Sequence, residues 1–244
     1  MPSEAAGSTR RPTAAEYRAV ARPAGLFTEA VNYPVSGIIC VVAHRYRVSP
    51  TTLTLGNLFL GVNASLVVTV LAVPVAQSTG LAVVVGVLAW LVWQAAYCCD
   101  CSDGQLSRVT STSSAAGGRL DVLCDIAVQV ALVGAVAAVT TATRPETPSW
   151  LLGVFAASWM INMVTSVMAK EGTNTSLVLS ESAAVRLIKL TRDYGFMITM
   201  IGFVIAVNPA WMVFLVYAFT AVNVSFLVAS IVQATAASHR SDGT

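Results

Sequence analysis

The stretch "CDCSDGQLSRVTSTSSAAGGRLDVLCD", residues 99–125, decides how this sequence is interpreted. It holds Asp100, Asp103, Asp121 and Asp125, which are four of the twelve acidic residues of the chain. Long apolar runs lie on both sides of it. Because carboxylates are costly in or beside a bilayer, acids placed there indicate a function. The stretch therefore predicts a functional acid cluster on membrane helices.

The composition is typical of a helical membrane protein. The 244 residues are 56% hydrophobic and 11% charged, with a mean hydropathy of +0.72, whereas soluble domains carry about a quarter charged residues. The apolar residues come in long blocks, which favours several membrane-spanning helices. The five cysteines show no spacing typical of a secreted disulfide framework. We expect membrane lipids and no nucleic acid among the partners.

The order of segments predicts an all-α integral membrane fold with six transmembrane helices. Residues 1–14 are expected to be a disordered cytosolic tail. Residues 15–47 are expected to form an interfacial amphipathic helix, because their apolar core is short and is broken by Pro34; a spanning helix is the alternative. The six-helix catalytic domain is predicted over 48–235 and a second cytosolic tail over 236–244.

Six apolar runs supply the predicted spans. They lie at roughly 52–75, 79–99, from the acidic stretch to about 141, 148–169, 194–207 and 210–232. The fifth run is short for a bilayer core of about 30 Å. Its helix is therefore expected to begin before Tyr194 and to project from the membrane.

Lysine and arginine set the expected orientation. With six spans, both termini lie on one side together with the segments 100–119 and 170–193, and this side carries thirteen of the fourteen basic residues. Only Arg144 lies opposite. The positive-inside rule makes the basic side cytosolic. Both termini and the acidic stretch are therefore expected to face the cytosol, in a bacterial cell membrane.

The spacing of the four aspartates predicts that they converge. Asp100 and Asp103 are three residues apart, and Asp121 and Asp125 are four apart, so each pair lies on one helix face. The helices are consecutive, and the short polar link "STSSAAG" predicts antiparallel neighbours. A lone aspartate at a helix end is usually a cap or a solvated residue. Four of them at helical spacing are not explained that way.

Converging carboxylates need a bound cation or bound protons. Aspartate oxygens are the hard ligands that Mg²⁺, Mn²⁺ and Ca²⁺ prefer, and two such ions can clamp a phosphoryl group during its displacement. Arg108 and Arg119 are placed to neutralise part of the charge. Gly104, Gly117 and Gly118 leave room for backbone or substrate to approach.

The stretch resembles the signature of the CDP-alcohol phosphotransferases, also called CDP-alcohol phosphatidyltransferases. That signature reads Asp-x-x-Asp-Gly-x-x-Ala-Arg, a variable spacer, then Gly-x-x-x-Asp-x-x-x-Asp. The matching residues are Asp100, Asp103, Gly104, Ser107, Arg108, Gly117, Asp121 and Asp125, with an eight-residue spacer. Ser107 stands where the family usually has alanine, and Ile126 where a basic residue is common. "SPTTLTLGN" resembles the Pro-Asn-x-x-Thr start of the family's first helix through Pro50 and Thr54, with Thr51 in place of the asparagine.

The resemblance implies a reaction and a set of site residues. A substituted phosphate, expected to be phosphatidyl, would pass from a CDP-linked donor such as CDP-diacylglycerol to a small polar alcohol, with release of CMP. Two Mg²⁺ or Mn²⁺ ions would be held by Asp100, Asp103, Asp121 and Asp125, with Asp125 also the general base. The residues implied for CDP binding are Asp103, Gly104, Ser107, Arg108, Gly117, Pro50 and Thr54. A homodimer is compatible with the resemblance.

A basic segment after the fourth span is the candidate acceptor site. Lys170, Arg186, Lys189 and Arg192 lie on the expected cytosolic side, and the last three recur at helical spacing. One interpretation is an anion pocket for an acceptor that bears phosphate, such as inositol phosphate or glycerol phosphate. The other is ordinary anchoring to anionic lipid.

Two further functions compete with this one. Membrane prenyltransferases also use aspartates and Mg²⁺, but they usually split two Asp-rich motifs across a long stretch, whereas all four aspartates lie here within 26 residues. A cation transporter would use acids along a pathway, but it gives Gly104, Arg108 and Gly117 no role at these spacings.

Overall fold

The structure is a computed structural model that describes residues 11–171, 190 and 193–241. Its elements are α1 (Ala14–Ala19), a π-helical turn η1 (Thr28–Asn32), α2 (Tyr33–Arg45), α3 (Pro50–Val70), α4 (Ala72–Gln77), α5 (Thr79–Val109), α6 (Ala115–Thr143), α7 (Ser149–Glu171), α9 (Tyr194–Val207), a 3-10 turn η2 (Pro209–Trp211) and α10 (Met212–Ser241). Over the described ranges the chain has no strand, as the all-α prediction requires.

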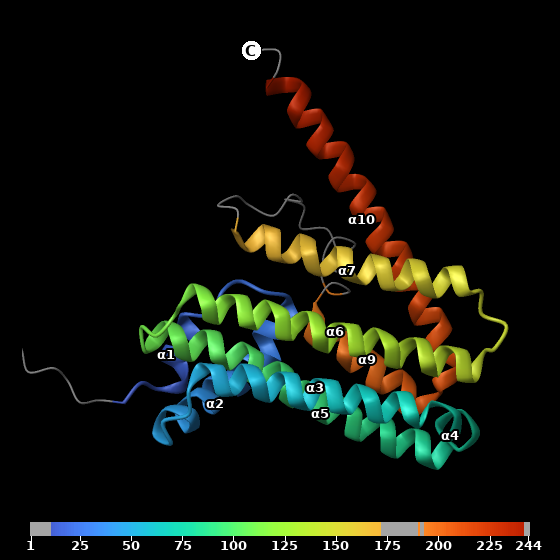
Figure 1. The fold of residues 1–244 in the computed structure, drawn as a ribbon, viewed down its shortest axis with the longest axis horizontal. Coiled ribbons are helices and arrows are strands. Elements are labelled where there is room, and N and C mark those ends of the chain that lie inside the picture. The colour runs from blue at the N-terminus through green and yellow to red at the C-terminus, as the bar shows by residue number, and fades with distance from the viewer. Residues whose placement is uncertain (1–10, 172–189, 191–192, 242–244) are drawn as a thin grey trace, which may run out of the picture.

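Three long helices, α3, α5 and α6, lie side by side in the bundle and are joined there by α9 (Figure 1). α3 packs against both α5 and α6, and α9 packs against α5. α7 and α10 pack against each other on one side of this group (Figure 1). α1 and α2 lie at the end where α5 finishes and α6 begins, and α2 packs along α5.

Within the part of the chain that the structure describes, four helices are long and apolar enough to cross a membrane: Pro50–Val70, Thr79–Val109, Ala115–Thr143 and Pro209–Val228. Two shorter apolar helices, Ser149–Val164 and Tyr194–Val207, occupy the places of the predicted fourth and fifth spans. Fourteen helical residues extend about 21 Å, which is less than a bilayer core of about 30 Å.

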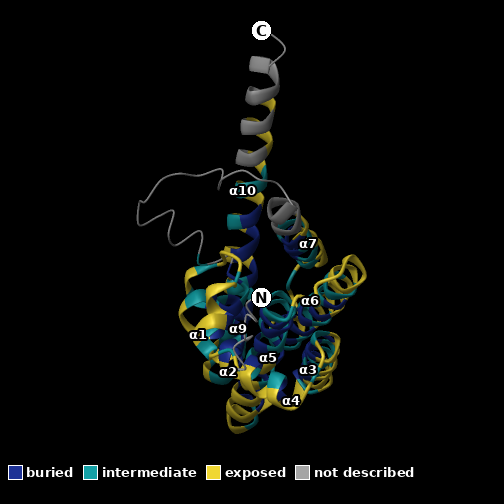
Figure 2. Ribbon diagram, turned by 90° about the vertical axis from the view of Figure 1, so that its left-hand side faces the viewer, coloured by how far each residue is buried: buried dark blue, intermediate teal, exposed yellow. Residues whose placement is uncertain are grey.

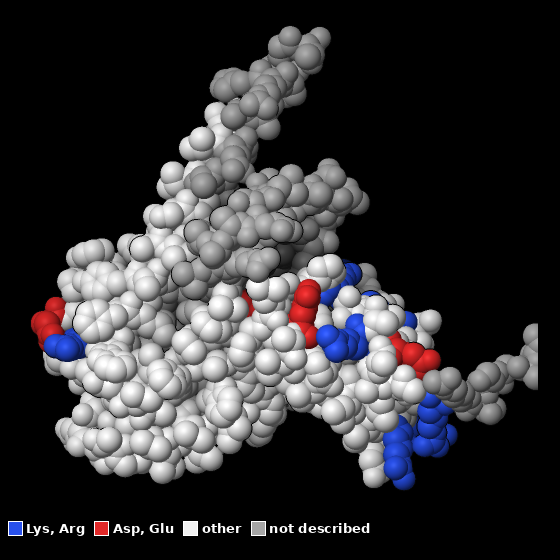
Figure 3. All heavy atoms as spheres, turned by 180° about the vertical axis from the view of Figure 1, so that it is seen from behind, with Lys and Arg blue, Asp and Glu red and all other residues white. Residues whose placement is uncertain are grey.

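The surface has the distribution expected of an integral membrane protein. Buried residues face the inside of the bundle and exposed ones line its outside (Figure 2). Much of the outside is apolar, including Phe59, Val70, Leu88 and Phe214, each more than half exposed. A broad uncharged surface separates the charged residues at one end from those in the opposite part (Figure 3). Lipid is the solvent that such a surface requires.

Residues 15–47 do not form the single amphipathic helix that the sequence predicts. α1 ends at Ala19, residues 21–25 are irregular, and a second helix follows through η1 and α2. The break contains Pro23, which lacks an amide hydrogen and also disfavours helical geometry in the residue before it.

Asp193 fastens this N-terminal segment to the start of α9. Its buried carboxylate accepts the backbone N–H of Thr28 at 2.9 Å and the Thr28 hydroxyl at 2.6 Å. The same carboxylate accepts the N–H of Phe196 at 3.4 Å and so caps α9. The expectation that this helix begins before Tyr194 is wrong, because Asp193 has extended backbone angles and is its N-cap.

α5 and α6, predicted to be antiparallel neighbours, both pack on α3, and each makes extensive contacts with that helix. A Cβ atom at Gly61 of α3 would lie 2.6 Å from Val128 Cγ1 of α6, so these helices meet closely. On the other side, Trp93 of α5 donates its indole N–H to Ser65 Oγ of α3 at 3.0 Å. The acid-bearing helices are therefore held at a distance set by α3.

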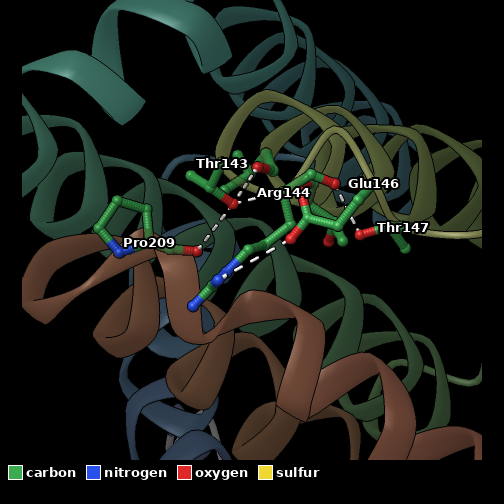
Figure 4. A network of polar contacts seen from close by, with 7 residues as sticks. Thr143, Arg144, Glu146, Thr147 and Pro209 are labelled. Carbon is green, nitrogen blue, oxygen red and sulfur yellow. Dashed lines mark hydrogen bonds and ion pairs between the residues drawn. The ribbon is translucent and has the colours of Figure 1, made fainter.

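At the end of the bundle opposite the acidic stretch, the turn between α6 and α7 contacts η2 (Figure 4). The hydroxyl of Thr143 is 3.5 Å from the carbonyl oxygen of Pro209, and the hydroxyl of Thr147 donates to the Arg144 carbonyl at 2.7 Å. Arg144 also pairs with Glu146 at 3.8 Å, with both side chains largely exposed. Such a pair contributes little stability.

Gly86 permits the close approach of α5 and α9. A Cβ atom there would lie 2.5 Å from the backbone nitrogen of Ala206. We expect Gly86→Ala to lower the free energy of unfolding by about 1–3 kcal/mol, because the backbones must separate. Thermal unfolding of the protein in detergent measures this change.

The matched control is Gly134→Ala on α6, where an added Cβ has nothing within 4 Å. This variant should be neutral or more stable by up to about 1 kcal/mol through its higher helix propensity. Equal unfolding temperatures for the two variants would contradict the close contact of α5 with α9.

Candidate active site

The structure brings the four predicted aspartates together between α5 and α6. One carboxylate oxygen each of Asp100, Asp103 and Asp121 lies within 4.8 Å of the others. Asp103 is buried, and the other two are half-buried. Asp125 lies one turn further along α6, and its Oδ1 and that of Asp100 both contact the side-chain nitrogen of Asn57 on α3. Three carboxylates thus form a tight group, and the fourth lies beside it.

Thr54 on α3 contacts this group from the side. Its hydroxyl donates a short hydrogen bond to Asp103 Oδ2, and both residues are buried. Ser49 and Pro50 begin α3 as N-cap and first helical residue, with the Ser49 hydroxyl accepting the N–H of Thr52 at 3.2 Å. The first turns of α3 therefore lie beside the acids, and Thr54 supports an aspartate.

Asn57 lies one turn after Thr54 and contacts two further aspartates. Its side-chain nitrogen donates to Asp100 Oδ1 at 3.2 Å and to Asp125 Oδ1 at 3.4 Å. The Asn57 side chain is buried, with only 3% of its surface exposed. One amide of α3 thus connects an acid of α5 with an acid of α6.

Arg108 lies over Gly104 at the end of α5. A Cβ atom at Gly104 would lie 3.0 Å from one guanidinium nitrogen of Arg108, so the glycine leaves the space that this side chain occupies. The Nε of Arg108 donates to the carbonyl oxygen of Val20 at 2.8 Å. The arginine of the signature therefore also ties the N-terminal segment to the acid cluster.

The remaining signature residues lie in the same end of the bundle. The hydroxyl of Ser107 donates to the Gly104 carbonyl at 3.2 Å, within its own helix. Ser114 caps α6, and its hydroxyl accepts the N–H of Gly117 at 3.0 Å. Gly117 is exposed in the first turn of α6. Ser107 lies four residues after Asp103, and Gly117 lies four residues before Asp121.

The predicted acceptor residues cannot be placed around this site. Arg186, Lys189 and Arg192 lie outside the described residues, and so does the side chain of Lys170 near the end of α7. The anion pocket therefore stays a prediction.

The tight acid group fits a hard divalent cation. Two oxygens bound to one ion at about 2.1–2.5 Å lie at most about 5 Å apart, so a spacing within 4.8 Å is compatible with shared coordination. Carboxylate oxygens are the donors that Mg²⁺ and Mn²⁺ prefer. Asp100, Asp103 and Asp121 are thus the residues able to hold such an ion.

Two polar residues of this region were missed by the sequence interpretation. Asn57 had one usable signal, because it follows Thr54 by three residues and so shares its helix face. Asp193 had none, since its partner Thr28 is 165 residues away in the chain.

Comparison with known families agrees with the signature. The family model described as CDP-alcohol phosphatidyltransferase matches residues 47–222. This range includes α3, α5, α6 and all four aspartates, whereas the N-terminal segment with α1 and α2 precedes it. A search of the curated proteins finds no match for the chain.

We expect the acid group to bind Mn²⁺ and an Asp121→Asn variant to bind it more weakly, by more than about tenfold, since even loss of a residue that only hydrogen-bonds a metal ligand costs about 10–100-fold. The electron paramagnetic resonance signal of free Mn²⁺, titrated with purified protein, measures the affinity. Glu146→Gln at the opposite end is the control and should bind as the wild type does. Equal affinity in both variants would exclude Asp121 from the metal site.

Proposed function

The chain belongs to the CDP-alcohol phosphatidyltransferase family, and we propose that it transfers a phosphatidyl group from CDP-diacylglycerol to a small polar alcohol, releasing CMP. Phosphatidyl transfer from a CDP-alcohol, in phospholipid biosynthesis at a membrane, follows from the family. The choice of donor and acceptor and the roles of individual residues are the proposal. The observation that carries it is the convergence of Asp100, Asp103 and Asp121 with Asp125 beside them.

The proposed reaction is a displacement at phosphorus. The acceptor hydroxyl oxygen forms a bond to the phosphorus that carries the diacylglycerol, and the bond from that phosphorus to the CMP oxygen breaks. CMP leaves with the bonding electron pair. The proton of the hydroxyl passes to a carboxylate oxygen of Asp125. Phosphoryl transfer of this kind depends on positioning and charge neutralisation more than on covalent catalysis.

Asp100, Asp103 and Asp121 would hold Mg²⁺ or Mn²⁺, with Asp125 at a second ion. When bound, the ions supply charge neutralisation at the phosphate oxygens. Asp125 suits the role of base because it lies next to the tight group rather than within it, and a general base must be within hydrogen-bonding reach of the hydroxyl.

The remaining signature residues would bind the CDP part. The guanidinium of Arg108 supplies positive charge close to the acid group, and arginine presents several donors to phosphate oxygens. A nucleotide would approach from this end of the bundle, past Gly104, Ser107 and Gly117. Pro50 and Thr54 would line the same approach from α3.

The location of the site supports a lipid donor. The acids lie near the ends of two helices that are long and apolar enough to cross a membrane. A diacylglycerol donor can keep its acyl chains in the bilayer while its headgroup reaches the acids. The proposal includes six spans, a cytosolic site in a bacterial membrane, a homodimer, and an acceptor such as inositol phosphate or glycerol phosphate bound near Lys170, Arg186, Lys189 and Arg192.

The test is release of CMP from CDP-diacylglycerol by purified protein with Mn²⁺ or Mg²⁺, with inositol 1-phosphate, glycerol 3-phosphate, serine and inositol as separate acceptors. We expect one acceptor to support turnover. Asp125→Asn should lower kcat by about 10²–10⁴-fold, the usual contribution of a general base, whereas Glu146→Gln should leave it unchanged.

Several outcomes would contradict the proposal. Unchanged CMP release by Asp125→Asn would remove its role as base. Turnover of a prenyl diphosphate, or metal flux across vesicles without CMP release, would favour a prenyltransferase or a cation transporter instead.

A further inference from the structure

We propose that Asn57 is a positioning residue, which holds the metal-binding Asp100 and the general base Asp125 at a fixed separation through one side-chain amide. This inference rests on the proposed function. It assigns a catalytic contribution to α3, which carries none of the signature aspartates.

The contacts of Asn57 join three helices at one point. Its amide nitrogen lies 3.2 Å from Asp100 Oδ1 on α5 and 3.4 Å from Asp125 Oδ1 on α6. An amide NH₂ group has two hydrogens, so it can donate to both acceptors at once. Asn57 is 3% exposed, which keeps water from competing for these donors.

The need for such a bridge follows from the packing. α5 and α6 each pack extensively on α3 rather than on each other. The separation of Asp100 from Asp125 therefore depends on what α3 places between the two helices. The hydroxyl of Thr54, one turn earlier, contacts Asp103 in the same way. α3 thus presents a hydroxyl and an amide, three residues apart, to three of the four acids.

Other asparagines of the bundle show what a purely local role looks like. Asn63, also on α3, is exposed and donates to the Phe59 carbonyl of its own helix at 2.7 Å. Asn223 on α10 is buried and donates to the Phe219 carbonyl at 2.8 Å. Asn57 differs from both, because its donors reach side chains of the acid cluster on two other helices.

The amide also matches the chemistry of its acceptors. Hydrogen bonds to ionised groups are stronger than neutral ones, and groups that hydrogen-bond metal ligands orient them. An apolar side chain of the same size at position 57 would leave both carboxylates without this donor. The positions of the Asp100 carboxylate, which would bind metal, and of the Asp125 carboxylate, which would accept the proton, would then both become less well fixed.

The experiment compares Asn57→Leu and Asn57→Ala with Asn63→Leu, the matched change on the same helix. Two measurements are made on each: the Mn²⁺ affinity of the protein without substrate, by electron paramagnetic resonance, and kcat and KM for CMP release. We expect both Asn57 variants to bind Mn²⁺ about 10–100-fold more weakly, the usual cost of losing a residue that hydrogen-bonds a metal ligand. At saturating Mn²⁺ their kcat should stay reduced by at least about tenfold, since the base is misplaced, with KM for the donor within a few-fold of wild type.

Asn57→Gln keeps the amide on a longer side chain and should recover part of the Mn²⁺ affinity. Unfolding temperatures without metal identify any variant that fails to fold, and Asn57→Ala, which adds no bulk, then replaces the leucine variant. Wild-type values of Mn²⁺ affinity and kcat in a folded Asn57 variant would overturn the proposal. So would equal losses in Asn63→Leu.

The two proposals fail in distinguishable ways. If wild-type protein releases no CMP from any CDP-linked lipid, the proposed function fails. The Mn²⁺ titration, which needs no substrate, still decides whether Asn57 supports the acid cluster.

Discussion

Mutual repulsion of the clustered carboxylates is the constraint on which the rest of the structure depends. Two unit charges about 4 Å apart repel by about 4 kcal/mol at an effective dielectric constant of about 20, and three carboxylates approach to within 4.8 Å here. A hydrogen bond to a charged group contributes about 1.5–3 kcal/mol, so the donors of Thr54 and Asn57 offset only part of this cost. A divalent cation would offset the remainder, and the spacing of the carboxylates is compatible with binding one.

Packing of small residues is what allows the acids to be held there. Apolar helices gain little from one another by hydrophobic burial in lipid, so close contact of their backbones has to supply the association. Gly61 brings α3 against α6, and Gly86 brings α5 against α9, each at distances that a Cβ atom would obstruct. α3 is consequently the helix that fixes both acid-bearing helices. Its position determines the site more than the link between α5 and α6 does.

The sequence was sufficient to predict the parts that depend on local spacing. Asp100 and Asp103, like Asp121 and Asp125, lie on single helix faces because three or four residues separate them, and the apolar runs locate the helices. Neighbour relations were not predictable in this way, because helices that are apolar all round have no polar face to show which side packs inward. Hence the packing of α3 on both α5 and α6, and the contacts of Asn57 with Asp100 and Asp125, become visible only in the structure. The helix break near Pro23 has a cause in the neighbouring sequence, whereas the hydrogen bonds of Thr28 with Asp193 join residues 165 positions apart.

The N-terminal segment is hydrogen-bonded to α5, one of the helices that carry the acids, and to the N-cap of α9, even though the family match begins only at residue 47. Arg108, a residue of the signature, donates its Nε–H to the Val20 carbonyl. The carboxylate of Asp193 accepts the backbone N–H and the hydroxyl of Thr28. Between them, these contacts fix the segment 20–28 across the ends of α5 and α9. α2 continues this attachment, since the Ser36 hydroxyl donates to the Cys98 carbonyl at 3.1 Å and the Ser102 hydroxyl lies 3.2 Å from the Ser36 carbonyl. Ser102 lies between Asp100 and Asp103, so the segment supports the turn of α5 that carries two of the four acids.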